Sequence, residues 1–229
     1  MHIPDGFINA GVSAAAGGVA VVGIGYSLKK AKETLEEKAA PMAGLVAAFI
    51  FAVQMLNFPI AAGTSGHLLG GALAAILVGP WAGAICVAVV LMVQALFADG
   101  GLTALGLNIV NMALITAFGG YAIFLFLRRA LPKTRGGVVT ASGIAAMISV
   151  VLASLGFTLE YALGGTGTTS VGTVAAAMVG VHFLIGIGEG LITAITVGVV
   201  LNVRPDLVYG AQDMLPGLEI RRDTVTVGS

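Results

Sequence analysis

The residues best suited to chemistry stand at the start of the chain, where His2 follows Met1. A histidine in second position offers a metal ion three nitrogens in one plane: the terminal amine, the His2 amide nitrogen once deprotonated, and imidazole Nδ1. The amine and amide close a five-membered ring with the metal, and the amide and imidazole close a six-membered ring. Planar nitrogen sets suit Ni(II) or Cu(II). The pattern therefore predicts an N-terminal chelate that needs a fourth nitrogen.

The composition is that of an integral membrane protein. Of the 229 residues, 58% are hydrophobic and 10% are charged, whereas soluble domains average about 25% charged residues. The mean hydropathy is +1.02. The net charge of zero excludes a strongly basic nucleic-acid-binding protein. The one cysteine, Cys86, lies in an apolar run and cannot form an intramolecular disulfide.

The basic residues fall in three clusters along the chain. These are Lys29, Lys30, Lys32 and Lys38, then Arg128, Arg129, Lys133 and Arg135, then Arg204, Arg221 and Arg222. Because cytoplasmic loops of membrane proteins carry an excess of Lys and Arg, each cluster is expected to be cytoplasmic. An even number of spans must then separate the first cluster from the second, and the second from the third.

Seven apolar segments fit between these clusters as transmembrane helices. They are residues 7–28, 42–58, 67–79, 81–97, 105–127, 137–160 and 172–201. The segment 67–79 is short and is counted as a span because the charge parity requires it. We expect an all-α integral membrane protein with seven transmembrane helices, the N-terminus outside and the C-terminus cytoplasmic. Residues 1–201 would form one membrane domain with a metal-binding segment at 1–6, and 202–229 a cytoplasmic tail.

The first apolar segment does not fit a cleaved signal peptide. Its positive charges follow the apolar run instead of preceding it, and the run is too long. Met1 is expected to be retained, since methionine aminopeptidases act before small second residues and histidine is not small. The terminal amine should therefore belong to Met1 and lie on the external face.

The expected topology supplies a fourth nitrogen from His67. This residue follows the turn-rich segment FPIAAGTSG, which lies on the same external side as His2. His182 falls about ten residues inside the last span, and Glu189 follows it on nearly the same helical face. An ionisable residue within a membrane span is a functional candidate by default. The roles of His182 and Glu189 stay open at this point.

Three polar residues, Asp5, Asn57 and Asn108, are candidates for supporting the chelate. Asp5 either caps the first helix or holds an imidazole N–H as a neighbouring carboxylate. Asn57 and Asn108 lie near the external ends of their helices, where they either bond to other helices or orient His67 or the N-terminal segment. Asp99, in the turn ADGG, is expected to be a turn residue, although an external carboxylate also attracts cations.

Four segments together resemble the substrate-specificity (S) subunit of nickel/cobalt energy-coupling-factor (ECF) transporters, the NikM/CbiM family. They are MHIPDGF at the start, NFPIAAGTSGHLLGG at 57–71, GLNIVNMA at 106–113 and HFLIGIGEGLIT at 182–193. The resemblance covers most of residues 1–201. It implies that Ni(II) or Co(II) is the transported substrate, held by the Met1 amine, the His2 amide and imidazole nitrogens, and the His67 imidazole.

The resemblance also implies partners in the membrane. The sequence holds no GxxxxGK[ST] phosphate-binding loop, so ATP hydrolysis is expected from two ATPase subunits. A transmembrane coupling subunit and a small membrane accessory subunit complete the implied complex. Small residues spaced by four in segment 42–58 would permit close approach of the coupling subunit, with internal packing as the alternative. These are Ala43 with Ala47 and Ala48 with Ala52.

Two other functions fit the sequence less well than metal capture. A metal-dependent membrane enzyme needs an open coordination position and a nearby base, and a closed four-nitrogen site offers neither beyond Asp5. An S subunit for a non-metal substrate needs no N-terminal chelate. We therefore expect a non-enzymatic subunit, multi-pass in the inner or plasma membrane and in contact with lipid, that captures Ni(II) or Co(II) from outside.

Overall fold

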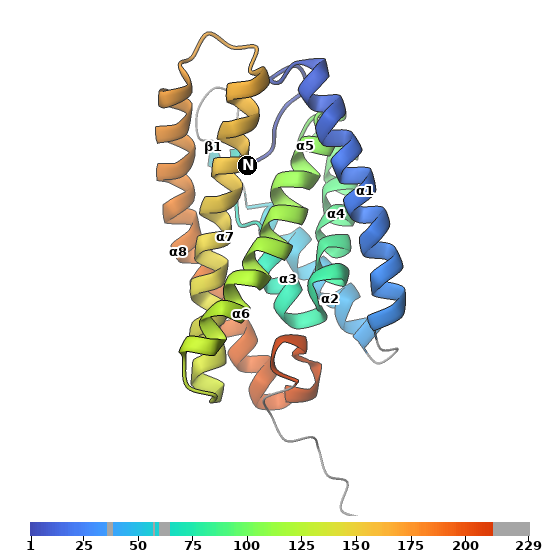
Figure 1. The fold of residues 1–229 in the computed structure, drawn as a ribbon, viewed down its shortest axis with the longest axis vertical. Coiled ribbons are helices and arrows are strands. Elements are labelled where there is room, and N and C mark those ends of the chain that lie inside the picture. The colour runs from blue at the N-terminus through green and yellow to red at the C-terminus, as the bar shows by residue number, and fades with distance from the viewer. Residues whose placement is uncertain (36–38, 57, 60–64, 213–229) are drawn as a thin grey trace, which may run out of the picture.

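The computed structural model describes residues 1–35, 39–56, 58–59 and 65–212, and these form a bundle of helices along one long axis (Figure 1). Seven helical segments occur in this part of the chain. They are α1 (Ala10–Thr34), α2 (Ala40–Gln54), α3 (Gly71–Val78), α4 (Pro80–Leu96), the run of α5 (Leu105–Ile109), the π-helix η2 (Val110–Gly119) and α6 (Gly120–Ala130), then α7 (Arg135–Gly164) and α8 (Val171–Val203). The described strands are β1 (Phe58–Pro59) and β2 (Ser65–Gly66), which pair antiparallel.

Four of these helical segments are long and apolar enough to cross a membrane. They are α1, the run Leu105–Ala130, α7 and α8, with 25, 26, 30 and 33 residues. The apolar helices α2 and α4 are shorter, with 15 and 17 residues. Their outward faces, with those of α1 and α8, carry exposed large apolar side chains such as Val21, Leu45 and Leu184. A multi-pass membrane protein accounts for such a surface because lipid, unlike water, solvates it favourably.

The helix α3 differs most from the sequence-based expectation. It has eight residues, all buried, and rises about 12 Å at 1.5 Å per residue, less than half of a bilayer core. Gly70 and Gly79, at its two ends, have φ of +79° and +88°, and Pro80 starts the next helix. Glycine adopts a positive φ without steric strain, so Gly70 can precede the helix and Gly79 can terminate it. The expected helix 67–79 thus begins four residues late, and His67 lies in the non-helical segment between β2 and α3.

The described basic residues gather at one end of the bundle. Lys29, Lys30 and Lys32 lie at the end of α1, Arg128 and Arg129 at the end of α6, Lys133 between α6 and α7, Arg135 at the start of α7, and Arg204 just after α8. Figure 1 shows these helix ends together at the bottom, while the N-terminus lies in the upper half of the bundle. Lys38, Arg221 and Arg222 lie outside the described residues. The bundle therefore has a basic end and, opposite it, an end that holds the N-terminal segment.

The chain after α8 packs back onto the bundle. Two short 3-10 turns, η3 (Pro205–Leu207) and η4 (Tyr209–Ala211), follow α8. Val208 and Ala211 are buried, and Arg128 donates a hydrogen bond to the Gly210 carbonyl. The first part of the expected tail is thus ordered against the helices, and residues 213–229 lie outside the described chain.

Candidate metal site

The N-terminal segment enters the bundle and is held there by Asn108. The Asn108 side chain accepts a hydrogen bond from the Ile3 N–H at 2.8 Å and donates one to the Ile3 carbonyl at 3.2 Å. Gly101 N–H donates to the same carbonyl at 2.9 Å. Both backbone groups of Ile3 are therefore satisfied within the protein, as a buried extended segment requires. The register of Met1 and His2 follows from these bonds.

A second set of bonds holds the segment just before α1. The Thr166 N–H and hydroxyl donate to the carbonyls of Phe7 and Gly6, at 3.1 and 2.7 Å. Asn9 N–H donates to the Gly164 carbonyl at 2.7 Å. These acceptors and donors lie at the junction of α7 and α8, so residues 3–9 bridge two distant parts of the bundle.

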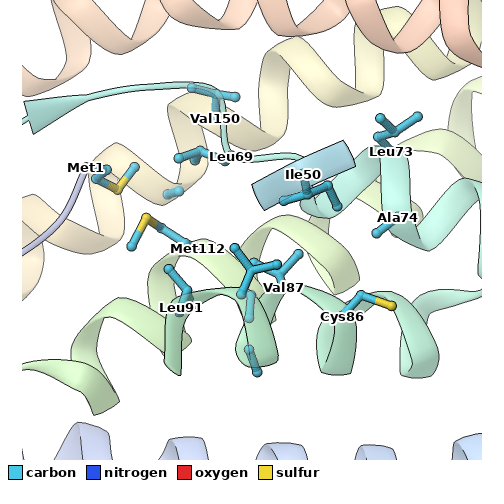
Figure 2. Close-up of a cluster of buried hydrophobic side chains, with 14 of the residues drawn as sticks. Met1, Ile50, Leu69, Leu73, Ala74, Cys86, Val87, Leu91, Met112 and Val150 are labelled. Carbon is cyan, nitrogen blue, oxygen red and sulfur yellow. The ribbon is translucent and has the colours of Figure 1, made fainter. Parts of the chain in front are cut away.

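The terminal amine of Met1 lies inside the protein. Figure 2 shows Met1 at the edge of a buried cluster that also holds Leu69, Leu91 and Met112. Burial lowers the pKa of the amine from 8.0 to about 4, although the charge of Asp99 opposes the shift. An amine with this pKa is uncharged at neutral pH and keeps a lone pair. It can therefore act as a nitrogen ligand without first losing a proton.

The structure brings His2 and His67 together. Their ring centroids are 4.6 Å apart with planes inclined by 31°, and the two residues are 4% and 0% exposed. Burial, and then the charge of the nearby terminal amine, lower the pKa of His2 to about 3. His67 Nδ1 lies 2.7 Å from the Leu68 carbonyl, so Nδ1 carries the proton and Nε2 carries the lone pair. That Nε2 has no hydrogen-bond partner among the described residues.

A carboxylate lies beside the His2 ring. Asp99 Oδ2 is 3.6 Å from His2 Nε2, and Gly100, the next residue, lies against Nδ1 on the same ring. The sequence interpretation treated Asp99 as a turn residue and missed this contact. Its position in an acidic turn on the expected external side was the available signal. The Asp99 carboxylate therefore faces the Nε2 side of the His2 ring.

Asp5 does not cap α1. Asn9 is the cap, since its Oδ1 accepts a hydrogen bond from Val12 N–H at 2.9 Å. The Asp5 carboxylate instead accepts from the N–H and hydroxyl of Thr103, at 2.7 and 2.5 Å. These bonds lower the pKa of Asp5. The capping expectation was wrong because α1 starts at Ala10, too far along the chain for Asp5 to reach its first N–H groups.

Two buried side chains hold the segment that follows His67. Glu189, 2% exposed, accepts hydrogen bonds from the N–H groups of Leu69 and Gly70 at 2.5 and 2.8 Å. Gln54 Nε2 donates to the Leu69 carbonyl at 2.7 Å. The sequence left the role of Glu189 open, and the structure connects it to the neighbourhood of His67.

Two candidate residues, His182 and Asn57, have no described hydrogen bond or ring contact to His2 or His67. His182 is fully buried in α8, with Nδ1 2.7 Å from the Met178 carbonyl, and it forms no described ring contact with His2 or His67. Asn57 lies outside the described residues. His182 Nε2 has no hydrogen-bond partner in the described part of the chain.

The small residues of α2 divide between two faces. Ala43 and Ala47 are partly buried and pack against the core, as the internal-packing alternative expected. Ala48 and Ala52 are exposed. A partner helix would therefore meet the second pair and not the first.

Side chains alone do not complete a metal site in the described residues. No group of three His, Cys, Asp or Glu side chains there is close enough to hold an ion. A cavity of about 440 Å³ opens beside His2 and is also lined by Asp5 and Asp99. The cavity therefore places the His2 side chain and two carboxylates around one space. The fold and this site define a multi-pass membrane protein with a candidate site for a nitrogen-seeking metal cation.

Comparison with known proteins identifies the family. Residues 2–207 match the family described as cobalt uptake substrate-specific transmembrane region, CbiM, and the chain belongs to it. The resemblance to the NikM/CbiM family is thereby confirmed.

Named relatives and a solved structure agree with this assignment. A putative fused nickel transport protein NikMN of Archaeoglobus fulgidus is 39% identical over 95% of this chain and 70% of its own length. A cobalt transport protein CbiM of Sorangium cellulosum is 34% identical over 91% of this chain and 94% of its own. A crystal structure of a transition metal transporter aligns with TM-score 0.81 and 32% identity, over 89% of this chain and 93% of that chain. The family is one of transport proteins, so the chain is not an enzyme.

Proposed function

We propose that this chain is the substrate-capture subunit of an ATP-driven importer of Ni(II) or Co(II). The metal would be held by the Met1 amine, the His2 amide nitrogen and Nδ1, and His67. The observation that carries the proposal is the convergence of two buried imidazoles, whose ring centroids are 4.6 Å apart, near the buried N-terminal residue. Burial of an unpaired charge is costly, so these nitrogens are favoured in their neutral forms. Neutral nitrogens have lone pairs with which to bind a cation.

The proposed ligand atoms follow from the positions of the ring nitrogens. His2 Nδ1 closes the six-membered chelate ring, which leaves Nε2 on the side of the ring that faces Asp99, 3.6 Å away. His67 uses Nε2 because Nδ1 is bonded to the Leu68 carbonyl. With the His2 amide deprotonated, four nitrogens surround the ion in a plane, an arrangement that favours Ni(II).

The proposed orientation has the basic end of the bundle in the cytoplasm and the N-terminal segment outside. The carboxylate-lined cavity beside His2 then opens to the external side and admits the hydrated ion. Seven crossings are retained if α3 and the non-helical segment before it together make one of them. Residues 1–201 form the proposed membrane domain, and 202–229 the cytoplasmic tail.

The proposed partners are a transmembrane coupling subunit, two ATPase subunits and a small membrane accessory subunit. Relatives named as nickel and cobalt transport proteins support metal as the cargo. The sequence itself holds no phosphate-binding loop. For the coupling surface, the exposed pair Ala48 and Ala52 is the better candidate, because Ala43 and Ala47 pack inward.

Metal binding to protein with an unmodified N-terminus tests the proposal. The protein would carry a C-terminal tag, and nickel and cobalt affinities would be measured by competition with a chromophoric chelator. We expect one ion per chain. His2→Ala and His67→Ala should each weaken binding by about 100-fold or more, which is about 2.8 kcal/mol.

A one-residue N-terminal extension gives the sharpest comparison. It keeps every side chain but removes the Met1 amine from the chelate, so it should weaken binding as severely as His2→Ala. The same residue added at the C-terminus is the matched control and should change nothing. An N-terminally extended protein that binds nickel normally would contradict the proposed ligand set.

A further inference from the structure

The proposed ligand His67 lies in a non-helical segment, and the backbone N–H groups that follow it have no helical carbonyl partners. In a helix, the N–H groups of Leu69 and Gly70 would meet carbonyls one turn earlier, but α3 begins only at Gly71. Unsatisfied backbone groups inside a membrane protein cost several kcal/mol each. Glu189 supplies both acceptors, one oxygen to each N–H, at 2.5 and 2.8 Å.

One peptide unit connects Glu189 to the His67 ring. The carbonyl of Leu68 and the N–H of Leu69 belong to the same peptide group, which is planar and rigid. The carbonyl accepts from His67 Nδ1–H at 2.7 Å, and the N–H donates to Glu189 Oε2. Any rotation of this peptide that broke the Glu189 bond would also turn the carbonyl away from the imidazole.

The opposite side of the segment is fixed as well. Gln54, at the end of α2, donates to the Leu69 carbonyl at 2.7 Å, so both backbone polar groups of Leu69 are bonded to buried side chains. Hydrogen bonds from two different helices, α2 and α8, therefore fix the orientation of the peptide groups on both sides of Leu69.

We propose that Glu189 is a positioning residue for the metal, acting through the Leu68–Leu69 peptide to aim His67 Nε2 at His2 and the Met1 amine. The arrangement resembles a carboxylate, histidine and metal triad with one peptide group inserted between carboxylate and ring. Hydrogen bonds in such a chain polarise one another, so the carboxylate also makes His67 Nε2 a better electron donor. The inference rests on the proposed function, because it assigns His67 the role of ligand.

Substitution of Glu189 and of a neighbour on the same helix tests the inference. In Glu189→Gln the side-chain oxygen still accepts one N–H, but the amide NH₂ faces the other, so nickel affinity should fall about tenfold. Glu189→Ala removes both acceptors and should weaken binding by about 100-fold. Thr193→Val is the control, since Thr193 lies one turn further on, is 1% exposed and forms no described bond to the His67 segment. Its nickel affinity should stay within about twofold of wild type.

The visible absorption of bound nickel separates positioning from a purely structural role. At saturating nickel, both Glu189 variants should lose the d–d spectrum of the wild-type site and approach that of His67→Ala, because the fourth nitrogen is misplaced. A residue that only stabilised the start of α3 would lower the unfolding temperature of the metal-free protein and leave this spectrum unchanged.

The outcomes are distinguishable. Wild-type affinity and spectrum in Glu189→Gln and Glu189→Ala would overturn the inference while leaving the proposed function intact. Should Glu189→Ala fail to fold, Glu189→Gln, which matches glutamate in size, decides by the same two measurements. If His67→Ala left nickel affinity at the wild-type value, both the proposed function and this inference would be overturned.

Discussion

Gly100→Ala tests whether the loop after α4 fixes the position of His2. Gly100 has φ of +99°, and an added Cβ would lie 2.9 Å from His2 Nδ1 and 3.1 Å from Asn108 Nδ2. Ordinary contact begins at 3.4 Å, so the imidazole must move by about 0.5 Å or the loop must shift. The atom that is displaced is the one proposed to bind the metal.

The expected magnitude has two parts. An L-residue in the left-handed region costs about 1–2 kcal/mol, so Gly100→Ala should lower the stability of the metal-free protein by this amount. A misplacement of 1 Å in a binding constellation can cost about 100-fold, so 0.5 Å should cost about tenfold. Nickel affinity is therefore expected to fall by about 1.4 kcal/mol.

A matched glycine separates these two parts. Gly79 has φ of +88°, and a Cβ there would meet the Tyr209 ring at 3.3–3.4 Å. Gly79 lies toward the basic end of the bundle, whereas His2 lies toward the opposite end. Thermal unfolding of the metal-free proteins should show similar losses for Gly79→Ala and Gly100→Ala. Chelator competition should show weakened nickel binding for Gly100→Ala alone. Equal nickel affinity in both variants would refute the reasoning that this loop positions the ligand.

Three further substitutions concern the residues around the N-terminal segment. Asn108→Ala removes the hydrogen-bond acceptor of the buried Ile3 N–H. It should lower stability by about 1–3 kcal/mol, measured by thermal unfolding, and nickel affinity by about tenfold, measured by chelator competition. Asp99→Asn keeps the size of the side chain but removes its charge, so it should slow nickel capture in stopped-flow measurements and reduce the salt dependence of that rate. Asp5→Asn should lower the unfolding temperature at neutral pH and leave nickel affinity unchanged, because Asp5 bonds to Thr103. Since Thr103 holds the folded-state pKa of Asp5 below its ordinary 3.8, this stability is present above pH 3.8 and is lost as pH falls through the folded-state pKa.

Each of these three predictions has an outcome that contradicts it. Unchanged nickel affinity in a folded Asn108→Ala protein would mean that Ile3 does not set the position of His2. If Asp99→Asn captured nickel at the wild-type rate at low salt, the Asp99 carboxylate would have no role in attracting the ion. For Asp5→Asn, a loss of nickel affinity greater than tenfold would show that Asp5 supports metal binding as well as bonding to Thr103.

The long helices were predictable because each is a continuous apolar run between turn or charge signals. The segments expected at 137–160 and 172–201 are α7 and α8, Arg135–Gly164 and Val171–Val203, extended by a few residues at their ends. The region between α2 and α3 was not predictable in this way. Its helix ends depend on Gln54 and Glu189, whose bonding partners lie 15 and 120 positions away along the chain.

The chemistry of the candidate site was easier to predict than its support. His2 was found from chelate geometry and His67 from charge parity, both of which use residue type and position alone. The bonds made by Asn108, Asp99 and Glu189 depend on how the helices pack. The π-helix of Val110–Gly119 likewise has no composition signal, since a π-helix differs from an α-helix only in its hydrogen-bond register.

The bonds that hold the N-terminal segment also set the order in which the site can be assembled during synthesis. Gly6 is bonded to a residue 160 positions later, Ile3 to one 105 positions later, and Leu69 to one 120 positions later. A nascent chain emerges N-terminus first, so all the proposed ligands leave the ribosome long before Glu189 does. A chain stalled before α8 would carry every ligand nitrogen but lack part of the framework that holds them. Tight nickel binding would therefore report completed membrane insertion.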